Sequence, residues 1–309
     1  MIKVSNLTLK YGNFSAVDNI SFEVSAGSGI TGLLGPNGAG KTTTMRILTG
    51  YLKPTSGYVE IDSLPMNPEE NLLEIKKRIG YLPESNPLYP EMLVEEYLNF
   101  IAKVRALDGK KLKDTKEFLI EKLALKSHLY TPIGLLSKGF KQRTALAATL
   151  IHDPSVIILD EPTSGLDPNQ ISTIRNFIKT LSKNKTLILS THILKEVEDI
   201  CERVIIIHKG KIVSDKKIAD LQKSNLYVLI AKSNSTKDNI LDILKQLPLI
   251  SKVQMEAISH SEFKKYICEL KENKPELLFR EIKNYDWDVI EFSSLERSLE
   301  EVFKELTLN

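Results

Sequence analysis

The sequence predicts an α/β fold built around a phosphate-binding loop, followed by a second, smaller α+β domain. Three observations support this prediction. The glycine-rich segment GPNGAGKT (35–42) directly follows an apolar, strand-like run, and VIILD (156–160) is a second apolar strand that ends in an acidic residue. Beyond about residue 220, strand-like and helical segments alternate in a new order. The first two features are typical of a parallel sheet whose strand ends carry a ligand site.

The chain opens with two antiparallel strands, at 2–12 and 14–24, because polar and apolar residues alternate on both sides of a turn near Tyr11–Gly12. A buried strand at 28–35 then runs into the glycine-rich loop. A helix begins after that loop and ends at Gly50, a residue suited to helix ends. Short strands are predicted at 57–62 and 79–82.

Helical spacing of the apolar residues from about 89 to 152 predicts an all-helical insertion. The β pattern then returns, with strands predicted at 156–160, 186–190, 203–208 and 211–215 and helices at about 170–182 and 193–202. These elements assign residues 1–220 to a P-loop α/β core that has a β-hairpin layer at its front edge.

Residues 221–309 are predicted to form a C-terminal module with the order βαββαβ, typical of a ferredoxin-like fold. Its strands are expected at 226–231, 253–258, 263–270 and 288–294, and its helices at 237–247 and 275–284. A final helix over 295–306 would place a set of apolar residues on one face, namely Leu295, Leu299, Val302, Phe303 and Leu306. That face either packs on its own domain or docks on a partner.

Composition excludes several classes of protein. The formal net charge is +2, so bulk electrostatics does not indicate a nucleic-acid binder. Cys201 and Cys268 lie far apart, which argues against a disulfide framework or a zinc site. The N-terminus lacks the apolar stretch of a signal peptide, and the longest apolar runs have only strand length. We therefore expect any membrane spans to be supplied by another chain.

The segment GPNGAGKT has the chemistry of phosphate binding. Its glycines allow backbone N–H groups to turn toward phosphate oxygens, and the helix that follows adds its positive N-terminal end. Lys41 is expected to reach the β- and γ-phosphates of ATP, and the Thr42 hydroxyl to coordinate Mg²⁺. The nucleotide-binding residues predicted in this segment are Gly35, Pro36, Asn37, Gly38, Ala39, Gly40, Lys41, Thr42 and Thr43.

The acidic pair Asp160–Glu161 ends an apolar strand, and its two carboxylates can take different roles. Asp160 is expected to anchor the Mg²⁺ shell, which leaves Glu161 free to orient or deprotonate the attacking water. An acidic pair after a strand is usually only the start of a loop. Here the segment EPTSGLD (161–167) continues it, and the combination is a specific signal.

These motifs, in this order, resemble those of the ATP-binding subunits of ABC transporters, and the resemblance covers residues 1 to about 220. GPNGAGKT matches the Walker A motif, VIILD the Walker B motif, LSKGF (136–140) the signature motif and SGLD (164–167) the D-loop. The resemblance implies that Glu161 is the catalytic glutamate, that His192 contacts the γ-phosphate and that Tyr11 stacks on adenine. It also implies nucleotide-binding roles for Ser137, Gly139 and Asp167.

Two positions depart from the common family pattern. In the signature motif, Lys138 replaces a glycine and Phe140 replaces a glutamine, although Ser137 and Gly139 remain. In YLPES (81–85), Glu84 stands where glutamine is usual, and its carboxylate can ligate Mg²⁺ but adds negative charge beside the triphosphate. Both variants, and the ending LEEVFKELT, resemble the ABC-2-type exporter subgroup.

The resemblance implies an ATPase subunit that dimerises with itself, or with a related subunit, and drives a separate multi-span permease. It would work at the cytoplasmic face of the cell membrane, with the permease docking near residues 84–98. The alternative is a soluble ABC ATPase that acts on DNA or ribosomes. Ribosome-associated relatives generally carry two cassettes and DNA-repair relatives a long coiled coil, and this chain has one cassette with an ordinary helical insertion. No nucleic-acid partner is therefore expected.

Overall fold

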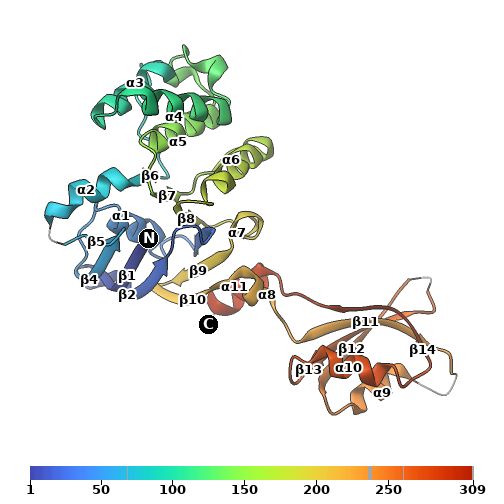
Figure 1. The fold of residues 1–309 in the computed structure, drawn as a ribbon. Coiled ribbons are helices and arrows are strands. Elements are labelled where there is room, and N and C mark those ends of the chain that lie inside the picture. The colour runs from blue at the N-terminus through green and yellow to red at the C-terminus, as the bar shows by residue number, and fades with distance from the viewer. Residues whose placement is uncertain (68, 236–238, 260, 308–309) are drawn as a thin grey trace. The chain divides into compact units, whose positions relative to one another are not determined.

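The computed structural model describes residues 1–67, 69–235, 239–259 and 261–307 (Figure 1). The chain forms two compact units, Met1–Ile218 with Leu306–Asn309, and Ala219–Glu305. The first unit has two β-sheets and the second has one, and each unit has its own buried hydrophobic cluster, so each one buries apolar side chains within itself.

The first unit alternates strands and helices along the chain. Its elements are β1 (Ile2–Tyr11), β2 (Phe14–Val24), β3 (Ile30–Leu34), α1 (Lys41–Leu48), β4 (Ser56–Ile61), β5 (Leu64–Pro65), the 3-10 helix η1 (Glu69–Asn71), α2 (Leu72–Arg78), β6 (Ile79–Leu82), α3 (Val94–Val104), α4 (Gly109–Lys122), the 3-10 helices η2 (Lys126–His128) and η3 (Ile133–Leu135), α5 (Lys138–Leu150), β7 (Val156–Asp160), α6 (Pro168–Leu181), β8 (Thr186–Thr191), α7 (Leu194–Ile200), β9 (Arg203–His208) and β10 (Lys211–Lys217).

A mostly parallel six-stranded sheet, in the order β10-β9-β3-β8-β7-β6, forms the centre of this unit. Neighbouring strands are parallel except for the edge pair β10 and β9. All residues of β3, β7 and β8 are buried, as expected for parallel strands covered on both faces. The carboxyl ends of these strands meet at one edge of the sheet, where ligands of open α/β sheets bind.

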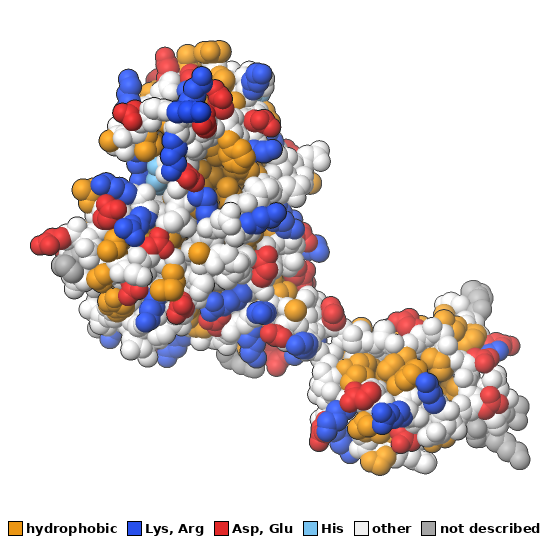
Figure 2. All heavy atoms as spheres, in the orientation of Figure 1, with side chains coloured by type: hydrophobic (Ala, Val, Ile, Leu, Met, Phe, Trp, Pro, Cys, Tyr) orange, Lys and Arg blue, Asp and Glu red, His pale blue; other side chains and the backbone are white. Residues whose placement is uncertain are grey.

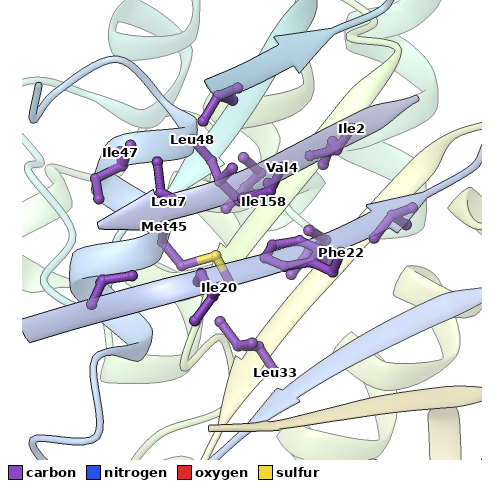
Figure 3. Close-up of a cluster of buried hydrophobic side chains, with 14 of the residues drawn as sticks. Ile2, Val4, Leu7, Ile20, Phe22, Leu33, Met45, Ile47, Leu48 and Ile158 are labelled. Carbon is purple, nitrogen blue, oxygen red and sulfur yellow. The ribbon is translucent and has the colours of Figure 1, made fainter. Parts of the chain in front are cut away.

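A four-stranded antiparallel sheet, in the order β2-β1-β4-β5, forms the front layer. Its apolar side chains, among them Ile2, Leu7 and Ile20, pack in one buried cluster with Met45 of α1 and Ile158 of β7 (Figure 3). The cluster joins both sheets to α1 and so fixes the loop that precedes α1. The predicted α/β core with a front β layer is confirmed.

The helical insertion is less continuous than its periodicity predicts. The helix α3 begins only at Val94, where the Glu96 carboxylate accepts a hydrogen bond from the Leu93 N–H over 3.0 Å. Between α4 and α5 the chain forms only the short helices η2 and η3. We also did not predict α2, because a seven-residue helix with Ile75 as its one buried residue shows almost no periodic signal. In the described part of the chain, no helix combines the length and hydropathy that crossing a membrane requires.

The second unit has the predicted order βαββαβ. After α8 (Ile218–Gln222), its elements are β11 (Leu226–Ser233), α9 (Ile240–Gln246), β12 (Ile250–Ala257), β13 (Lys264–Leu270), α10 (Pro275–Ile282), β14 (Trp287–Ser294) and α11 (Leu299–Thr307). The sheet is antiparallel throughout, in the order β12-β13-β11-β14, and α9 and α10 cover one face of it. This arrangement is the ferredoxin-like one. The first two residues of the helix predicted at 237–247 lie outside the described residues.

The predicted start of the final helix at residue 295 is wrong. The backbone N–H groups of Leu295 and Arg297 donate to the carbonyl oxygens of Leu226 and Gln222, which holds this segment out of a helix. Ser298 then caps α11: its hydroxyl accepts from the Glu301 N–H (3.2 Å) and its own N–H donates to the Glu301 carboxylate (3.0 Å). Leu295 therefore does not share the apolar face of α11.

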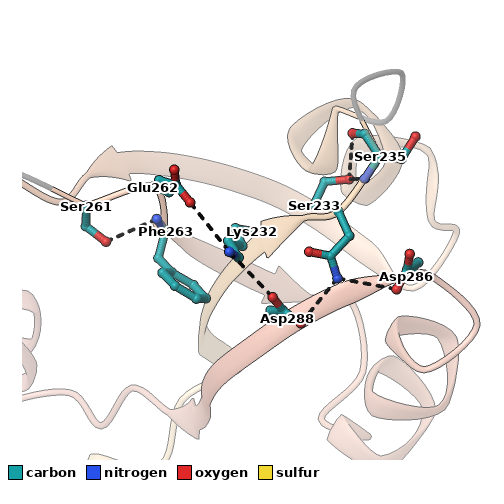
Figure 4. A network of polar contacts seen from close by, with 9 residues as sticks. Lys232, Ser233, Ser235, Ser261, Glu262, Phe263, Asp286 and Asp288 are labelled. Atoms are coloured by element: carbon teal, nitrogen blue, oxygen red, sulfur yellow. Dashed lines mark hydrogen bonds and ion pairs between the residues drawn. The ribbon is translucent and has the colours of Figure 1, made fainter.

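An exposed polar network links the end of β11 to β14 (Figure 4). The Lys232 ammonium lies 3.5 Å from Glu262 and 3.6 Å from Asp288, and the Asn234 amide donates to Asp286 and Asp288. Ion pairs this exposed contribute little to stability, so the buried cluster is the main stabilising feature of the unit.

Candidate nucleotide site

The loop between β3 and α1 is shaped by close backbone contacts. Gly40 has a φ of 108°, and a Cβ atom there would lie 2.4 Å from the Ala16 carbonyl oxygen, so the position requires glycine. Lys41 is only 7% exposed, and its Nζ donates to the carbonyl oxygens of Gly35 (2.8 Å) and Pro36 (3.2 Å). The first turn of α1 contains no acidic residue, which leaves its positive end available to an anion.

An open pocket of about 480 Å³ lies against this loop. It is lined by Tyr11, Phe14, Ala16, Asn37, Gly38, Gly40, Lys41, Thr42, Thr43, Glu84, Glu161 and His192. The fold thus brings together residues from the β1–β2 hairpin, the glycine-rich loop and the chain segments after β6, β7 and β8. Gly35, Pro36 and Ala39 belong to the same loop but are not among the lining residues.

The Asp160 carboxylate ends β7 and is fully buried. Within the described residues, neither of its oxygens has a hydrogen-bond partner. Burial raises the pKa of the Asp160 carboxyl, and the nearby hydroxyls of Ser190 and Thr42 oppose that shift. A buried carboxylate that is held only by such weak contacts is costly, so the site suits a cation.

The oxygen atoms of Thr42, Glu84 and Asp160 fit a Mg²⁺ ion, which prefers carboxylate and hydroxyl ligands. No group of three or more His, Cys, Asp or Glu side chains suited to a metal occurs in the part of the chain that the structure describes. Three side-chain ligands would fill only part of the octahedral shell of Mg²⁺. Phosphate oxygens and water would complete it, as is usual for Mg²⁺ bound with a nucleotide.

Glu161 and His192 form a direct pair in the pocket. His192 Nδ1 lies 2.8 Å from Glu161 Oε1, and Glu161 is 8% exposed. Burial raises the pKa of the Glu161 carboxyl, and the hydrogen bond and charge of His192 oppose that shift. A carboxylate with a raised pKa is a better proton acceptor, and its contact with His192 fixes its orientation.

The Lys41 ammonium interacts electrostatically with these acidic groups. Burial lowers the pKa of its ammonium, while the carboxylates of Glu161, Asp160 and Glu84 raise it. The ammonium therefore lies among negative charges even before a nucleotide enters, and it offsets part of their repulsion.

Ser137, Gly139 and Asp167 form a second group, which does not line the pocket. Ser137 caps α5 by accepting from the Phe140 N–H (3.4 Å), and Asp167 caps α6 by accepting from the Gln170 N–H (3.0 Å). Gly139 lies against the Gln170 side chain, and Lys138 occupies the space that a side chain at Gly165 would fill. The signature segment and the 164–167 segment are therefore neighbours.

Phe140, at one of the departures from the family pattern, is held between two side chains. Its ring stacks on the His128 imidazole at a centroid distance of 3.8 Å, and the Arg143 guanidinium lies 5.0 Å from its centroid. A glutamine could not make this stack, so Phe140 fixes the start of α5 by contacts of its own.

Phe14 is a pocket residue that sequence reasoning missed. It faces Tyr11 across the β1–β2 turn, and the two side chains are 63% and 55% exposed. Two exposed aromatic residues at a pocket rim suit a flat ring such as a base. The signal was available, because an aromatic residue directly opposite Tyr11 follows from the predicted hairpin.

Comparison with known proteins gives consistent matches. The ABC transporter family profile matches residues 17–164, which lie in the first unit. The uncharacterized ABC transporter ATP-binding protein MJ1023 of Methanocaldococcus jannaschii is 40% identical over 228 residues, 74% of this chain and 81% of that protein. The bacitracin transport ATP-binding protein BcrA of Bacillus licheniformis is 40% identical over 227 residues, 73% of this chain and 72% of BcrA.

A solved structure shows the same likeness. The dimeric ATP-binding cassette MJ0796, bound to ADP and Pi in a post-hydrolysis state, matches with a TM-score of 0.62 at 25% identity. The match covers 71% of this chain and 99% of the cassette.

Proposed function

The chain belongs to the ABC transporter family of ATP-binding, ATP-hydrolysing subunits, and from that premise we propose that two copies close around two ATP molecules to drive a separate permease in export. One observation carries this proposal. The pocket contains Lys41, Glu161 and His192, whereas Ser137 and Gly139 lie outside it. A single chain therefore carries two separate parts of an ATP site: the pocket, and the group formed by Ser137, Gly139 and Asp167. In a two-fold symmetric dimer, the pocket of each copy would face that group of the other copy.

Each residue of the site has a role that its surroundings support, including Asp160, which is buried and does not line the pocket. Lys41 binds the β- and γ-phosphates, while Thr42, Asp160 and Glu84 hold Mg²⁺, which when bound neutralises phosphate charge. Glu161 accepts the proton of the attacking water, and His192 orients Glu161 and reaches the γ-phosphate. Tyr11, with Phe14 beside it, stacks on the adenine ring.

The loop after β6 supplies a route from the site to a permease. The Asn86 amide donates to the Gln142 side chain on α5 over 2.5 Å, so the loop that carries Glu84 is tied to the helix that Ser137 caps. Next to this loop, the Tyr89 ring lies 6.0 Å from that of Tyr97 and 5.7 Å from that of Phe100. Tyr89 is 51% exposed, and we propose this aromatic cluster as the docking point of a cytoplasmic permease segment.

Replacing Glu84 with alanine is expected to weaken coupling more than ATP binding. The carboxylate lines the nucleotide pocket while its loop borders the docking cluster, so it can relay a signal between them. In proteoliposomes with the cognate permease, the stimulation of ATPase activity by the permease should fall by about fivefold or more. The ATP dissociation constant should stay within about threefold.

Glu84→Gln, which restores the residue usual in the family, is the matched control and should retain coupling. A collapse of ATP affinity with coupling intact in the residual activity would instead make Glu84 a simple metal ligand.

The alternative is a soluble ABC ATPase that acts on DNA or ribosomes. Figure 2 shows Lys and Arg side chains mixed with Asp and Glu over the visible face of the first unit, rather than a continuous basic surface. The relatives described above are transporter subunits. These observations favour transport, and we propose that the chain works at the cytoplasmic face of the membrane.

Copurification from detergent-solubilised native membranes tests this choice. We expect a multi-span membrane protein to copurify with the chain at a fixed ratio. Recovery of the chain in the soluble fraction with ribosomes or DNA, and with no membrane protein, would overturn the transport proposal.

We propose that residues up to about 220 form the catalytic domain and that 221–309 form an accessory domain. A chain that ends at Lys217 is then expected to bind Mg-ATP with a dissociation constant within about threefold of that of the full chain. The reason is that every pocket residue precedes position 193. Equilibrium ATP binding, with circular dichroism as a check of folding, provides the measurement. Loss of binding by a folded truncation would contradict the two-domain division.

A further inference from the structure

Two buried side chains near Glu161 share a short hydrogen bond that none of the roles above uses. Thr163 Oγ1 donates to Glu196 Oε1 over 2.6 Å, and the two residues are 2% and 0% exposed. Thr163 follows Glu161 by two positions, and Glu196 lies on α7, four positions after His192. The bond therefore links the segment that carries Glu161 to the helix that follows His192.

Glu196 depends on its partners because its carboxyl group has no access to solvent. A buried carboxyl group is tolerated only with a hydrogen bond or a nearby cation. The Nε of Arg175, on α6, lies 3.9 Å from Glu196 Oε1, and Arg175 Nη1 donates to Asp199 over 2.6 Å. Within the described residues, Glu196 Oε2 has no hydrogen-bond partner. The Thr163 hydroxyl is therefore a main source of stabilisation for this carboxyl group.

Glu161 itself has a strained backbone. Its φ of 51° lies in the left-handed region, which costs free energy for a residue other than glycine. The Glu161 N–H donates to the Ser190 carbonyl (3.0 Å), and the Ser164 N–H donates back to the Glu161 carbonyl (3.2 Å). These bonds define the turn and attach it to β8, while the Thr163 side chain attaches it to α7.

We propose that Thr163 and Glu196 are positioning residues for ATP hydrolysis, whose hydrogen bond holds the turn 161–166 against α7 so that Glu161 keeps its strained backbone and its contact with His192. His192 and Glu196 lie on one short stretch of chain, so a shift of the turn relative to α7 changes the Glu161–His192 geometry. A displacement of about 1 Å near reacting groups can cost ~10²-fold in rate. The inference rests on the role proposed above for Glu161.

Thr163→Val tests the inference, because valine has nearly the same shape but no hydroxyl. In the full chain, kcat for ATP hydrolysis should fall by about 10- to 100-fold, the range expected when a catalytic group is misplaced by up to about 1 Å. The ATP dissociation constant should change by less than about threefold. Thr163→Ser, which keeps the hydroxyl, should restore kcat to within about threefold of the unsubstituted value.

Thr186→Val is the matched control. Thr186 begins β8 and is fully buried, and its hydroxyl has no hydrogen-bond partner in the part of the chain that the structure describes. This change should leave kcat unaltered. If Thr163→Val does not fold, Glu196→Met serves as the second variant, because it keeps the length of the side chain and removes the acceptor of the Thr163 hydroxyl. The same fall in kcat is expected, and an unchanged kcat would contradict the proposal.

Thr163→Val in a Glu161→Gln background separates a positioning role from a general loss of structure in the site. If Thr163 acts through Glu161, then Thr163→Val should cause no further loss of the residual kcat. A loss by the same factor in both backgrounds, or an unchanged kcat in Thr163→Val alone, would overturn the proposal. Near-normal turnover by Glu161→Gln itself would overturn the proposed role of Glu161 and, with it, this inference.

Discussion

Replacing Glu161 with glutamine is expected to lower kcat for ATP hydrolysis by ~10²–10⁴-fold while ATP binding is preserved, because the general base is lost and the shape of the side chain is kept. Glutamine can still contact His192, which lies 2.8 Å from Glu161 Oε1, but it cannot take up a proton from water. Because the phosphate contacts remain, the variant should also accumulate as an ATP-bound dimer on size-exclusion chromatography.

Steady-state phosphate release and equilibrium ATP binding measure the two halves of this prediction. Glu69→Gln is a suitable control, because Glu69 is exposed and pairs with Lys53 at the surface. That change should leave both quantities unaltered. A Glu161→Gln chain that turns over at nearly the normal rate would show that another residue activates the water.

Replacing Lys41 with alanine is expected to weaken ATP binding by at least ~10²-fold, to the point where binding is no longer detectable at ordinary concentrations. The ammonium is nearly buried, so little water is available to replace it as a partner of the β- and γ-phosphates. Its removal also leaves Asp160, Glu161 and Glu84 without the cation that offsets their repulsion. Both effects oppose the entry of a triphosphate.

Equilibrium binding of ATP by the purified variant is the measurement, with thermal unfolding as a check that the fold survives. Lys53→Ala is the control, since Lys53 is an exposed lysine paired with Glu69. It should bind ATP as the unsubstituted chain does. Undiminished affinity in Lys41→Ala would overturn the assignment of the phosphate-binding loop.

Features that depend on short stretches of chain could be predicted from the sequence. The glycine-rich loop, the acidic pair at the end of β7 and the hairpin at Tyr11 each use local conformational rules, and the structure has them in the predicted segments. The order βαββαβ was equally accessible, because each strand and helix of the second unit has its own periodic signal. The predictions failed where the periodic pattern of a segment was weak, or where its contacts with distant segments outweighed that pattern. The segment 295–298 has helical spacing, yet backbone hydrogen bonds to the strand β11 and the helix α8 keep it out of a helix.

Contacts between distant segments could not be predicted in the same way. The placement of Phe140 between His128 and Arg143 depends on how the short helices before α5 fold back, and no periodic pattern encodes that path. The pairing of Thr163 with Glu196 joins positions 33 residues apart. Both side chains appear ordinary in the sequence, because burial is a property of the packed chain and not of the residue type.

By itself, the sequence determined the fold class, the nucleotide chemistry and the family, because these depend on residue types at fixed spacings along the chain. Only the tertiary structure decided which of those residues share one pocket and which lie apart from it. It placed Lys41, Glu161 and His192 together and left Ser137 and Asp167 on a separate group of helix caps. The physical reason is that strand order and helix packing, not sequence distance, set which side chains meet, and these are fixed by the burial of apolar surface over the whole unit.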